Sequence, residues 1–144
     1  MQFAYPIVLA FSVISLAPVA LCLGINCRGG YNCAYPGPGN SDVARQLVRY
    51  IDGIENSRFY NNGEQIACVI DGAGTTGYCA FWQKTNGLYG GTAKQKAHYI
   101  TDHGCKICGS VPLDYPNTND VEKGMLTFNA VAHTCRADTS GLCP

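Results

Sequence analysis

Charged residues are scarce in this chain. Its 144 residues include 10 Lys and Arg against 10 Asp and Glu, so the formal net charge is zero and charged residues make up 14% of the total. Without an excess of either sign, no overall field steers the chain toward nucleic acid or an anionic membrane, and nucleic-acid binding is not expected. The sequence also lacks Asn-x-Ser/Thr, so N-glycosylation is not expected.

A recognisable catalytic motif is also missing. A small secreted hydrolase or ribonuclease would need general acids and bases, for which the chain offers His98, His103, His133, Asp102, Glu55, Glu64 and Arg58. No spacing brings these side chains together, and none is a nucleophile in a recognisable setting. A metal site at His98, His103 and Cys105 is not favoured either, because positions five apart on a helix do not share a face. We therefore expect a non-enzyme without a cofactor or metal, and keep the hydrolase as the weakest alternative.

The first residues have the build of a secretory signal peptide. An apolar run extends from Ile7 to Leu21 without a charged side chain, and small residues at positions 20 and 22 suit a cut before Leu23. A single membrane anchor is the alternative, but the run is short for a span of ~20 apolar residues, and polar residues follow soon after it. We predict a signal peptide over residues 1–22, a secreted extracellular protein and no stable membrane anchor.

The nine cysteines fit this reading once Cys22 is removed with the signal peptide. Eight then remain: Cys27, Cys33, Cys68, Cys79, Cys105, Cys108, Cys135 and Cys143. An even set in an exported chain predicts four disulfides, although eight cysteines allow 105 pairings. A redox or zinc element at Cys105-x-x-Cys108 is less favoured, because a redox pair is expected to open a helix and Gly104 here ends one.

Two segments near the middle of the chain predict a helix and a hairpin. Residues 41–55 place apolar side chains at helical spacing, with Asn40 or Ser41 as the cap. Residues 64–70 and 78–83 are rich in β-forming residues and flank a glycine-rich turn. If that turn is centred between Ala73 and Gly74, Cys68 and Cys79 face each other and a cross-strand bridge is possible.

The second half predicts a further helix and two strands. Residues 91–104 begin with a capping box at Thr92 and Gln95 and end at a glycine. Residues 105–113 start as a strand that meets Pro112, which places it at an edge or ends it. Residues 124–135 alternate as a half-buried strand does, and the tail is expected to be irregular.

These elements predict one α+β domain over residues 23–144. The order is strand, helix, hairpin, helix, strand, strand, which gives a two-layer sandwich of an antiparallel or mixed sheet with helices on one face. No repeat or linker divides the chain. The aromatic residues around the second hairpin strand, Tyr78, Phe81, Trp82 and Tyr89, are expected mainly in the core, with an outward patch for carbohydrate or membrane as the alternative.

Three segments resemble the Kp-four family of fungal killer toxins. They are LGINCRG at 23–29, HGCKICGSVPL at 103–113 and GMLTFNAV at 124–131 with the cysteine at 135, and the similarity covers most of residues 23–135. The resemblance supports cleavage before Leu23. It implies a secreted, disulfide-crosslinked sandwich of about five antiparallel strands and two antiparallel helices.

The resemblance also implies two disulfides and a mode of action. By analogy Cys27 pairs with Cys105 and Cys33 with Cys108, each closing a long loop that contributes roughly 4 kcal/mol. The other four cysteines pair 68–79 with 135–143, or in one of two crossed ways.

The type toxin of the family acts without catalysis and resembles a calcium-channel blocker that halts the growth of susceptible fungal cells through basic surface residues, and the resemblance implies a similar action here. One such lysine stands two positions before the cysteine matched by Cys68, where this chain has Ile66. The remaining candidate cations are Lys84, Lys94, Lys96 and Lys106. We expect a monomer that binds a target-cell surface protein, with a cation channel as the candidate and a cell-wall carbohydrate as the alternative ligand.

Overall fold

The computed structural model describes residues 24–37, 39–72, 74, 76–137 and 139–144. The predicted signal peptide and the cut before Leu23 lie outside the described residues. Within the described part of the chain, no helix combines the length and apolar character needed to cross a bilayer.

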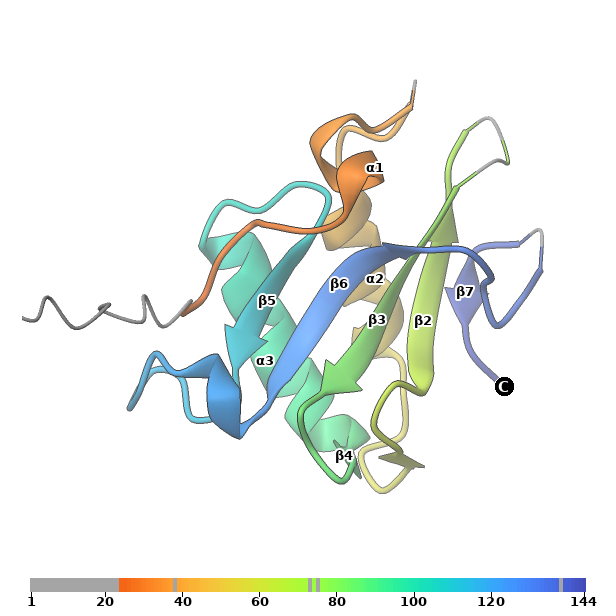
Figure 1. The fold of residues 1–144 in the computed structure, drawn as a ribbon. Helices are drawn as coiled ribbons and strands as arrows, with labels where there is room; N and C mark the ends of the chain where they lie inside the picture. The colour runs from red at the N-terminus through yellow and green to blue at the C-terminus, as the bar shows by residue number, and fades with distance from the viewer. Residues whose placement is uncertain (1–23, 38, 73, 75, 138) are drawn as a thin grey trace, which may run out of the picture.

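The described chain folds into an α+β structure (Figure 1). Its helices are α1 (Tyr31–Ala34), α2 (Val43–Asp52), α3 (Gly90–Asp102) and the 3-10 turn η1 (Val121–Lys123). Its strands are β1 (Phe59–Tyr60), β2 (Gln65–Ile70), β3 (Gly77–Gln83), β4 (Leu88–Tyr89), β5 (Gly109–Pro112), β6 (Met125–Val131) and β7 (Gly141–Leu142).

Five strands form the main sheet in the order β5-β6-β3-β2-β7, and all neighbouring pairs are antiparallel. The predicted hairpin is confirmed as β2 and β3, and Cys68 lies directly opposite Cys79 in its register. Strand β5 occupies one edge and ends at Pro112, as the proline predicts. The short strands β1 and β4 form a separate antiparallel ribbon.

The two long helices cover one face of the sheet and run antiparallel (Figure 1). The start of α2 lies beside the end of α3, because the amide of Ala44 donates to the carbonyl of Lys106 at 2.8 Å. At the other end the amide of Gly90 donates to the carbonyl of Arg58, just after α2, at 2.8 Å. This arrangement confirms the expected two-layer sandwich.

The hydrophobic core fills the space between the helices and the sheet. Helix α2 contributes Val43, Leu47 and Ile51, the positions that its helical spacing predicts. The largest fully buried side chains elsewhere in the core are Trp82, Tyr60, Tyr78, Phe128, Ile66, Ile100, Leu126, Val69 and Val111.

A β-bulge changes the direction of Ile66. The register of β2 against β3 shifts between Gln65 and Ala67, so Ile66 is the extra residue. Regular alternation would put Ile66 on the same face as Cys68. Instead Ile66 packs with Ala67 in the helix-side core, while Cys68 belongs to a separate cluster.

The predicted helix starts need correction. Helix α2 begins later than expected, after Asp42, so neither Asn40 nor Ser41 is its cap. Helix α3 begins at Gly90, and the predicted capping box is wrong because Thr92 lies inside the helix. The earlier start depends on glycine, because a Cβ at position 90 would lie 2.3 Å from the carbonyl oxygen of Glu55.

Several strand predictions also need correction. The expected N-terminal strand is reduced to one bridge between Asn26 and Ser110, and the strand expected from residue 105 starts at Gly109. The tail is not irregular throughout, since β7 pairs with β2. Elements as short as β7, α1, β1 and β4 carry too few residues to show a hydrophobic period, so their pairing depends on tertiary contacts.

Candidate binding surface

Four disulfides hold the described chain. Cys27–Cys105 and Cys33–Cys108 span 78 and 75 residues, and they are the pairs that the family resemblance implies. The sequence left the pairing of the other four cysteines open. In the structure Cys68 bonds to Cys79 and Cys135 to Cys143, at separations of 11 and 8 residues. The zinc element considered at Cys105 and Cys108 does not fit, because both sulfurs are bonded in disulfides, to Cys27 and Cys33 respectively.

Lys96 is the least accessible of the four lysines predicted to bind a target. Its side chain is 7% exposed, and its Nζ donates to the carbonyl oxygen of Tyr115 at 2.6 Å. Burial lowers the pKa of Lys96, and the nearby carboxylate of Asp114 partly opposes this. The ammonium therefore fastens α3 to the loop after β5 and presents little charge to solvent.

Lys84 lies at an open pocket just after β3. The pocket has a volume of about 520 Å³ and is lined by Asn62, Lys84, Thr85, Asn86, Gly87, Leu88 and Lys123. The Nζ of Lys84 is 2.6 Å from a carboxylate oxygen of Glu122, so this cation is part of an exposed ion pair. The pocket thus combines two ammonium groups with amide and hydroxyl side chains.

A tight turn shapes this pocket. Gly87 has a φ of +104°, and a Cβ there would lie 2.5 Å from the carbonyl oxygen of Tyr60 and 2.7 Å from the ring of Phe59. Only glycine permits this approach without strain. The amide of Thr85 donates to Oδ1 of Asn62 at 3.2 Å, which joins the turn to the loop after β1.

Lys94 and Lys106 do not line this pocket. Lys94 is half-buried on α3, and Lys106 is exposed between α3 and β5. The four predicted lysines therefore do not converge on one site. Lys123 and the two asparagines of the pocket were not singled out from the sequence, because they come from three separate turns that only the fold brings together.

Ile66, which stands where the type toxin of the family is expected to have a basic surface residue, does not lie on the surface. Its side chain is fully buried in the helix-side core. The bulge described above explains why this position is apolar in the present chain, since a lysine there would have to place its ammonium among core side chains.

The aromatic residues around β3 divide between core and surface. Tyr78 and Trp82 are fully buried, as expected for core packing, and Phe81 packs on the opposite face beside the cysteines. Tyr89 is 55% exposed and meets Phe59, 44% exposed, edge to face at 5.2 Å between ring centroids.

A second exposed aromatic pair, Tyr31 and Tyr35, lies at α1. Their ring centroids are 5.0 Å apart, and both side chains are more than two-thirds exposed. Neither Phe59 nor this tyrosine pair was predicted, because an exposed aromatic has no distinct signature in sequence.

The histidines do not assemble with the other proposed acid–base groups in the described part of the chain. Nε2 of His98 lies 2.9 Å from a carboxylate oxygen of Asp52, a contact between α3 and α2. His103 caps the end of α3. His133 lines a pocket of about 370 Å³ whose described lining residues include no carboxylate.

Arg58 and Glu55 do share a pocket, of about 320 Å³, with Tyr60 and the tail. Arg58 is held there by structural contacts, because its guanidinium donates to the carbonyl of Cys143 at 2.9 Å, donates to the carbonyl of Pro144 and lies over the Tyr60 ring. Burial raises the pKa of the Tyr60 phenol, although Arg58 opposes the shift. The phenol is therefore protonated near neutral pH and is no general base.

Comparison with known proteins relates the chain to a family and to a curated toxin. Residues 9–132 match the family model described as Kp4. The KP4 killer toxin of Ustilago maydis P4 virus is 38% identical over 120 residues, which cover 81% of this chain and 87% of the toxin sequence.

Proposed function

Because the chain belongs to the Kp4 family, we propose that it is a secreted killer-toxin-like protein that inhibits the growth of competing fungi or of plant host cells. The observation that carries this proposal is the 38% identity to a killer toxin over 120 residues. The action proposed is binding to a target-cell surface protein, without catalysis.

The crosslinked scaffold supports such an action. Four disulfides in one small domain suit an oxidising, extracellular environment. Binding requires only shape and a few well-placed polar groups, and a rigid scaffold loses little further entropy when it binds. A reactive centre is not needed for this activity.

The proposed target is a cation channel, with calcium-conducting channels as the candidates. Carboxylate rings at cation-channel entrances attract ammonium groups. Lys84 is the candidate contact that the structure supports best, since its side chain is exposed at an open pocket beside Lys123. Lys94 and Lys106 remain further candidates, and Lys96 would have to leave its carbonyl partner to take part.

The direct test applies purified, oxidised protein to fungal cells and to root cells, with and without added calcium. We expect growth inhibition that excess calcium relieves if a calcium channel is the target. Inhibition that calcium leaves unchanged would reject the channel but retain a surface target. No inhibition of either cell type at any dose would reject the toxin function.

A second candidate function is carbohydrate binding, which the exposed Phe59–Tyr89 pair favours. Exposed aromatic rings offer apolar faces for sugar rings, and the neighbouring pocket supplies amide and hydroxyl groups from Asn62, Asn86 and Thr85. Pull-down on chitin and glucan tests this function. Retention that is lost in Tyr89→Ala but kept in Tyr35→Ala, a matched exposed tyrosine, would support it, while no retention of the unmodified protein would reject it.

A further inference from the structure

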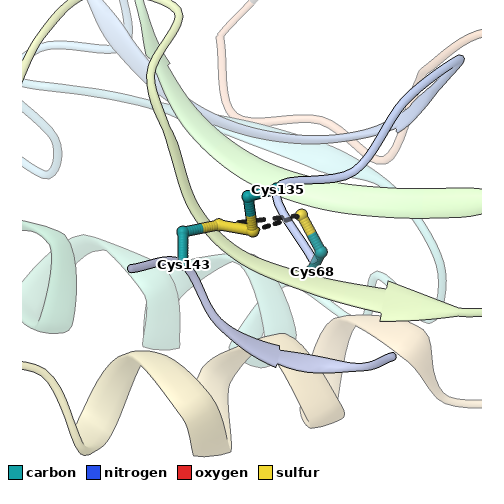
Figure 2. Close-up of side chains that lie close together, drawn as sticks. All are labelled: Cys68, Cys135 and Cys143. Atoms are coloured by element: carbon teal, nitrogen blue, oxygen red, sulfur yellow. Dashed lines mark hydrogen bonds between the residues drawn. A yellow bond between two sulfur atoms is a disulfide. The ribbon is translucent and has the colours of Figure 1, made fainter. Parts of the chain in front are cut away.

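The two short-range disulfides touch each other through their sulfur atoms. Sγ of Cys68 lies 3.5 Å from Sγ of Cys135 and 3.9 Å from Sγ of Cys143, although Cys68 is bonded to Cys79 (Figure 2). Two sulfurs in van der Waals contact are close enough for one to attack the other after a small movement. The bridge from β2 to β3 and the bridge that closes the tail therefore form one chemical cluster.

Of the two cysteines in the β2–β3 disulfide, Cys68 is the one that approaches the tail disulfide. Sγ atoms of Cys68, Cys135 and Cys143 lie within 4.8 Å of one another, and the sulfur of Cys79 is not part of that group. Among the described residues, the sulfurs of Cys27, Cys33, Cys105 and Cys108 form no such group of three. The other two disulfides therefore supply an internal control.

We propose that these two disulfides exchange partners through Cys68 when a dithiol reductant opens one of them. Oxidation of the dithiol to its disulfide reduces one bridge to two protein thiols, a two-electron step. If Cys135–Cys143 is opened, the Cys135 thiolate attacks Sγ of Cys68, a Cys68–Cys135 bond forms, the Cys68–Cys79 bond breaks and Cys79 leaves as a thiolate. This second step conserves one bridge and two thiols, so it needs no further reductant.

Reduction of the Cys68–Cys79 disulfide first leads to the same product. If Cys68–Cys79 is opened first, the Cys68 thiolate attacks Cys135, and Cys143 leaves as the thiolate. Both routes give a Cys68–Cys135 bridge with free thiols at Cys79 and Cys143. Cys135 is half-buried, whereas Cys68 and Cys79 are fully buried, so an external thiol reaches the tail bridge first. Attack through Cys143, at the longer contact, gives the minor Cys68–Cys143 product.

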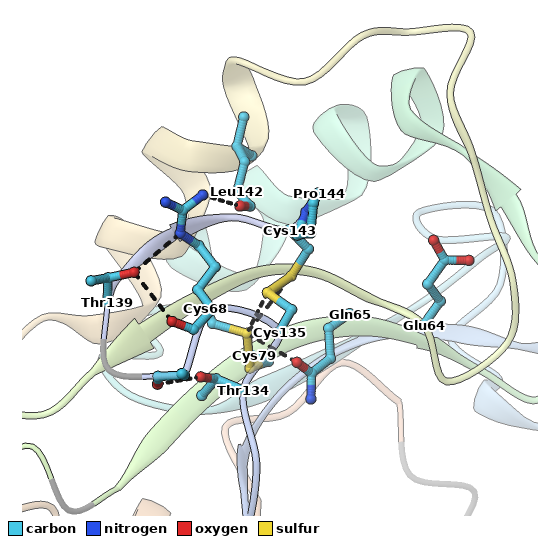
Figure 3. The surroundings of a disulfide bond; sticks show 12 residues. Glu64, Gln65, Cys68, Cys79, Thr134, Cys135, Thr139, Leu142, Cys143 and Pro144 are labelled. Carbon is cyan, nitrogen blue, oxygen red and sulfur yellow. Dashed lines mark hydrogen bonds between the residues drawn. A yellow bond between two sulfur atoms is a disulfide. The ribbon is translucent and has the colours of Figure 1, made fainter.

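The exchange would control whether the C-terminal tail stays attached to the sheet. In the oxidised protein, β7 pairs with β2 through two residue pairs, the amide of Cys143 donates to the carbonyl of Ile66, and the guanidinium of Arg136 donates to the carbonyl of Leu142. Figure 3 shows the tail residues Leu142 and Cys143 beside Cys68 and Cys135. When Cys68 is bonded to Cys135, Cys143 is a free thiol, so no disulfide closes the loop that carries β7. Release of β7 then uncovers the edge of β2, whose backbone groups can pair with another strand.

The test is limited reduction of the purified protein with dithiothreitol, followed by rapid alkylation and peptide mapping by mass spectrometry. In molecules that gain two alkyl groups, we expect labels on Cys79 together with Cys143, or on Cys79 together with Cys135 in the minor product, and Cys68 in a bridge. Labels confined to the original pairs, 135 with 143 or 68 with 79, would overturn the proposal. The control cysteines should be labelled only as the original pairs, 27 with 105 and 33 with 108.

A single substitution gives a second test without a reductant. In Cys79→Ser the free thiol should migrate from Cys68 to Cys143 or Cys135, so that more than half of the alkylation falls on the tail cysteines. In the matched variant Cys108→Ser the free thiol should stay on Cys33. A thiol that remains on Cys68 in folded Cys79→Ser would contradict the proposal, and if that variant does not fold, the reduction of the unmodified protein decides.

Discussion

The two faces of the five-stranded sheet are stabilised in different ways. On the helix-covered face, side chains such as Ile66, Trp82 and Phe128 are fully buried against α2 and α3. On the outer face no long helix of the described residues covers the sheet, and a small cluster of buried cysteines packs there with the partly buried Phe81 and Val131. Burial of apolar area stabilises the helix-covered face, whereas on the outer face disulfide bonds supply much of the stabilisation.

The disulfides of the two faces also differ in how far apart in the sequence their cysteines lie. Those at the helix-covered core, Cys27–Cys105 and Cys33–Cys108, join segments 78 and 75 residues apart. Those of the outer face close loops of only 11 and 8 residues. Because the entropy lost by the unfolded chain grows with loop length, the first pair should stabilise the fold more, and the second pair should act locally on β7 and the hairpin.

Removal of a long-range disulfide should have the largest effect. Cys27→Ser with Cys105→Ser should lower the free energy of unfolding by about 4.5 kcal/mol, the loop-entropy value for a loop of this length. Urea unfolding followed by tryptophan fluorescence measures the change, since Trp82 lies in the core. A loss smaller than that of the tail variant described below would contradict the comparison between the two faces.

A lysine at position 66 should have the next largest effect. Ile66→Lys places an ammonium in the fully buried site created by the bulge, and should cost about 3 to 4 kcal/mol. Ile66→Val is the matched control and should cost about 1 kcal/mol. If the lysine variant were as stable as the valine variant, the side chain at 66 would face solvent and the account of the bulge would fail.

Loss of the tail disulfide should be milder and local. Cys135→Ser with Cys143→Ser opens a loop of 8 residues and should lower the free energy of unfolding by about 2.5 kcal/mol. Hydrogen exchange should rise in β7 and at Ala67, which pairs with Leu142, while amides of β6 stay protected. A uniform rise over the whole sheet would show that the outer face is not a separate, local unit.

Removal of a surface cation should leave stability almost unchanged. Lys84→Gln breaks an exposed ion pair with Glu122 and should change the free energy of unfolding by less than about 0.5 kcal/mol. If Lys84 contacts the target, growth inhibition should fall severalfold, whereas Arg49→Gln, another exposed cation, should keep full activity. Equal potency of the two variants would remove Lys84 from the proposed contact surface.

Much of the helix-covered face could be predicted from the sequence. The spacing of Val43, Leu47 and Ile51 reports the helical period directly, and the glycine-rich turn between two segments of β-forming residues marks the hairpin. The start of α3 could not be predicted, because it depends on the close approach of Gly90 to Glu55. The bulge at Ile66 is equally hidden, since one inserted residue leaves no mark on composition.

The candidate site was predictable only in part. Lys84 could be proposed from the family resemblance, but its partners in the pocket come from turns that are distant in sequence. Lys96 looked like any other lysine of an exposed helix face, and only the fold shows its contact with Tyr115. The pairing of Cys68, Cys79, Cys135 and Cys143 stayed open because spacing alone allows several pairings, and only the fold shows that Cys68 bonds to Cys79 and Cys135 to Cys143.

The most direct test of the account is a wash-out experiment on susceptible cells treated with the oxidised protein. If the protein acts by binding a surface target, inhibition should saturate with concentration, stay constant with exposure time at a fixed dose, and reverse after washing. Inhibition that grows with time at a dose far below the number of target sites, and that persists after washing, would contradict the account and indicate catalysis.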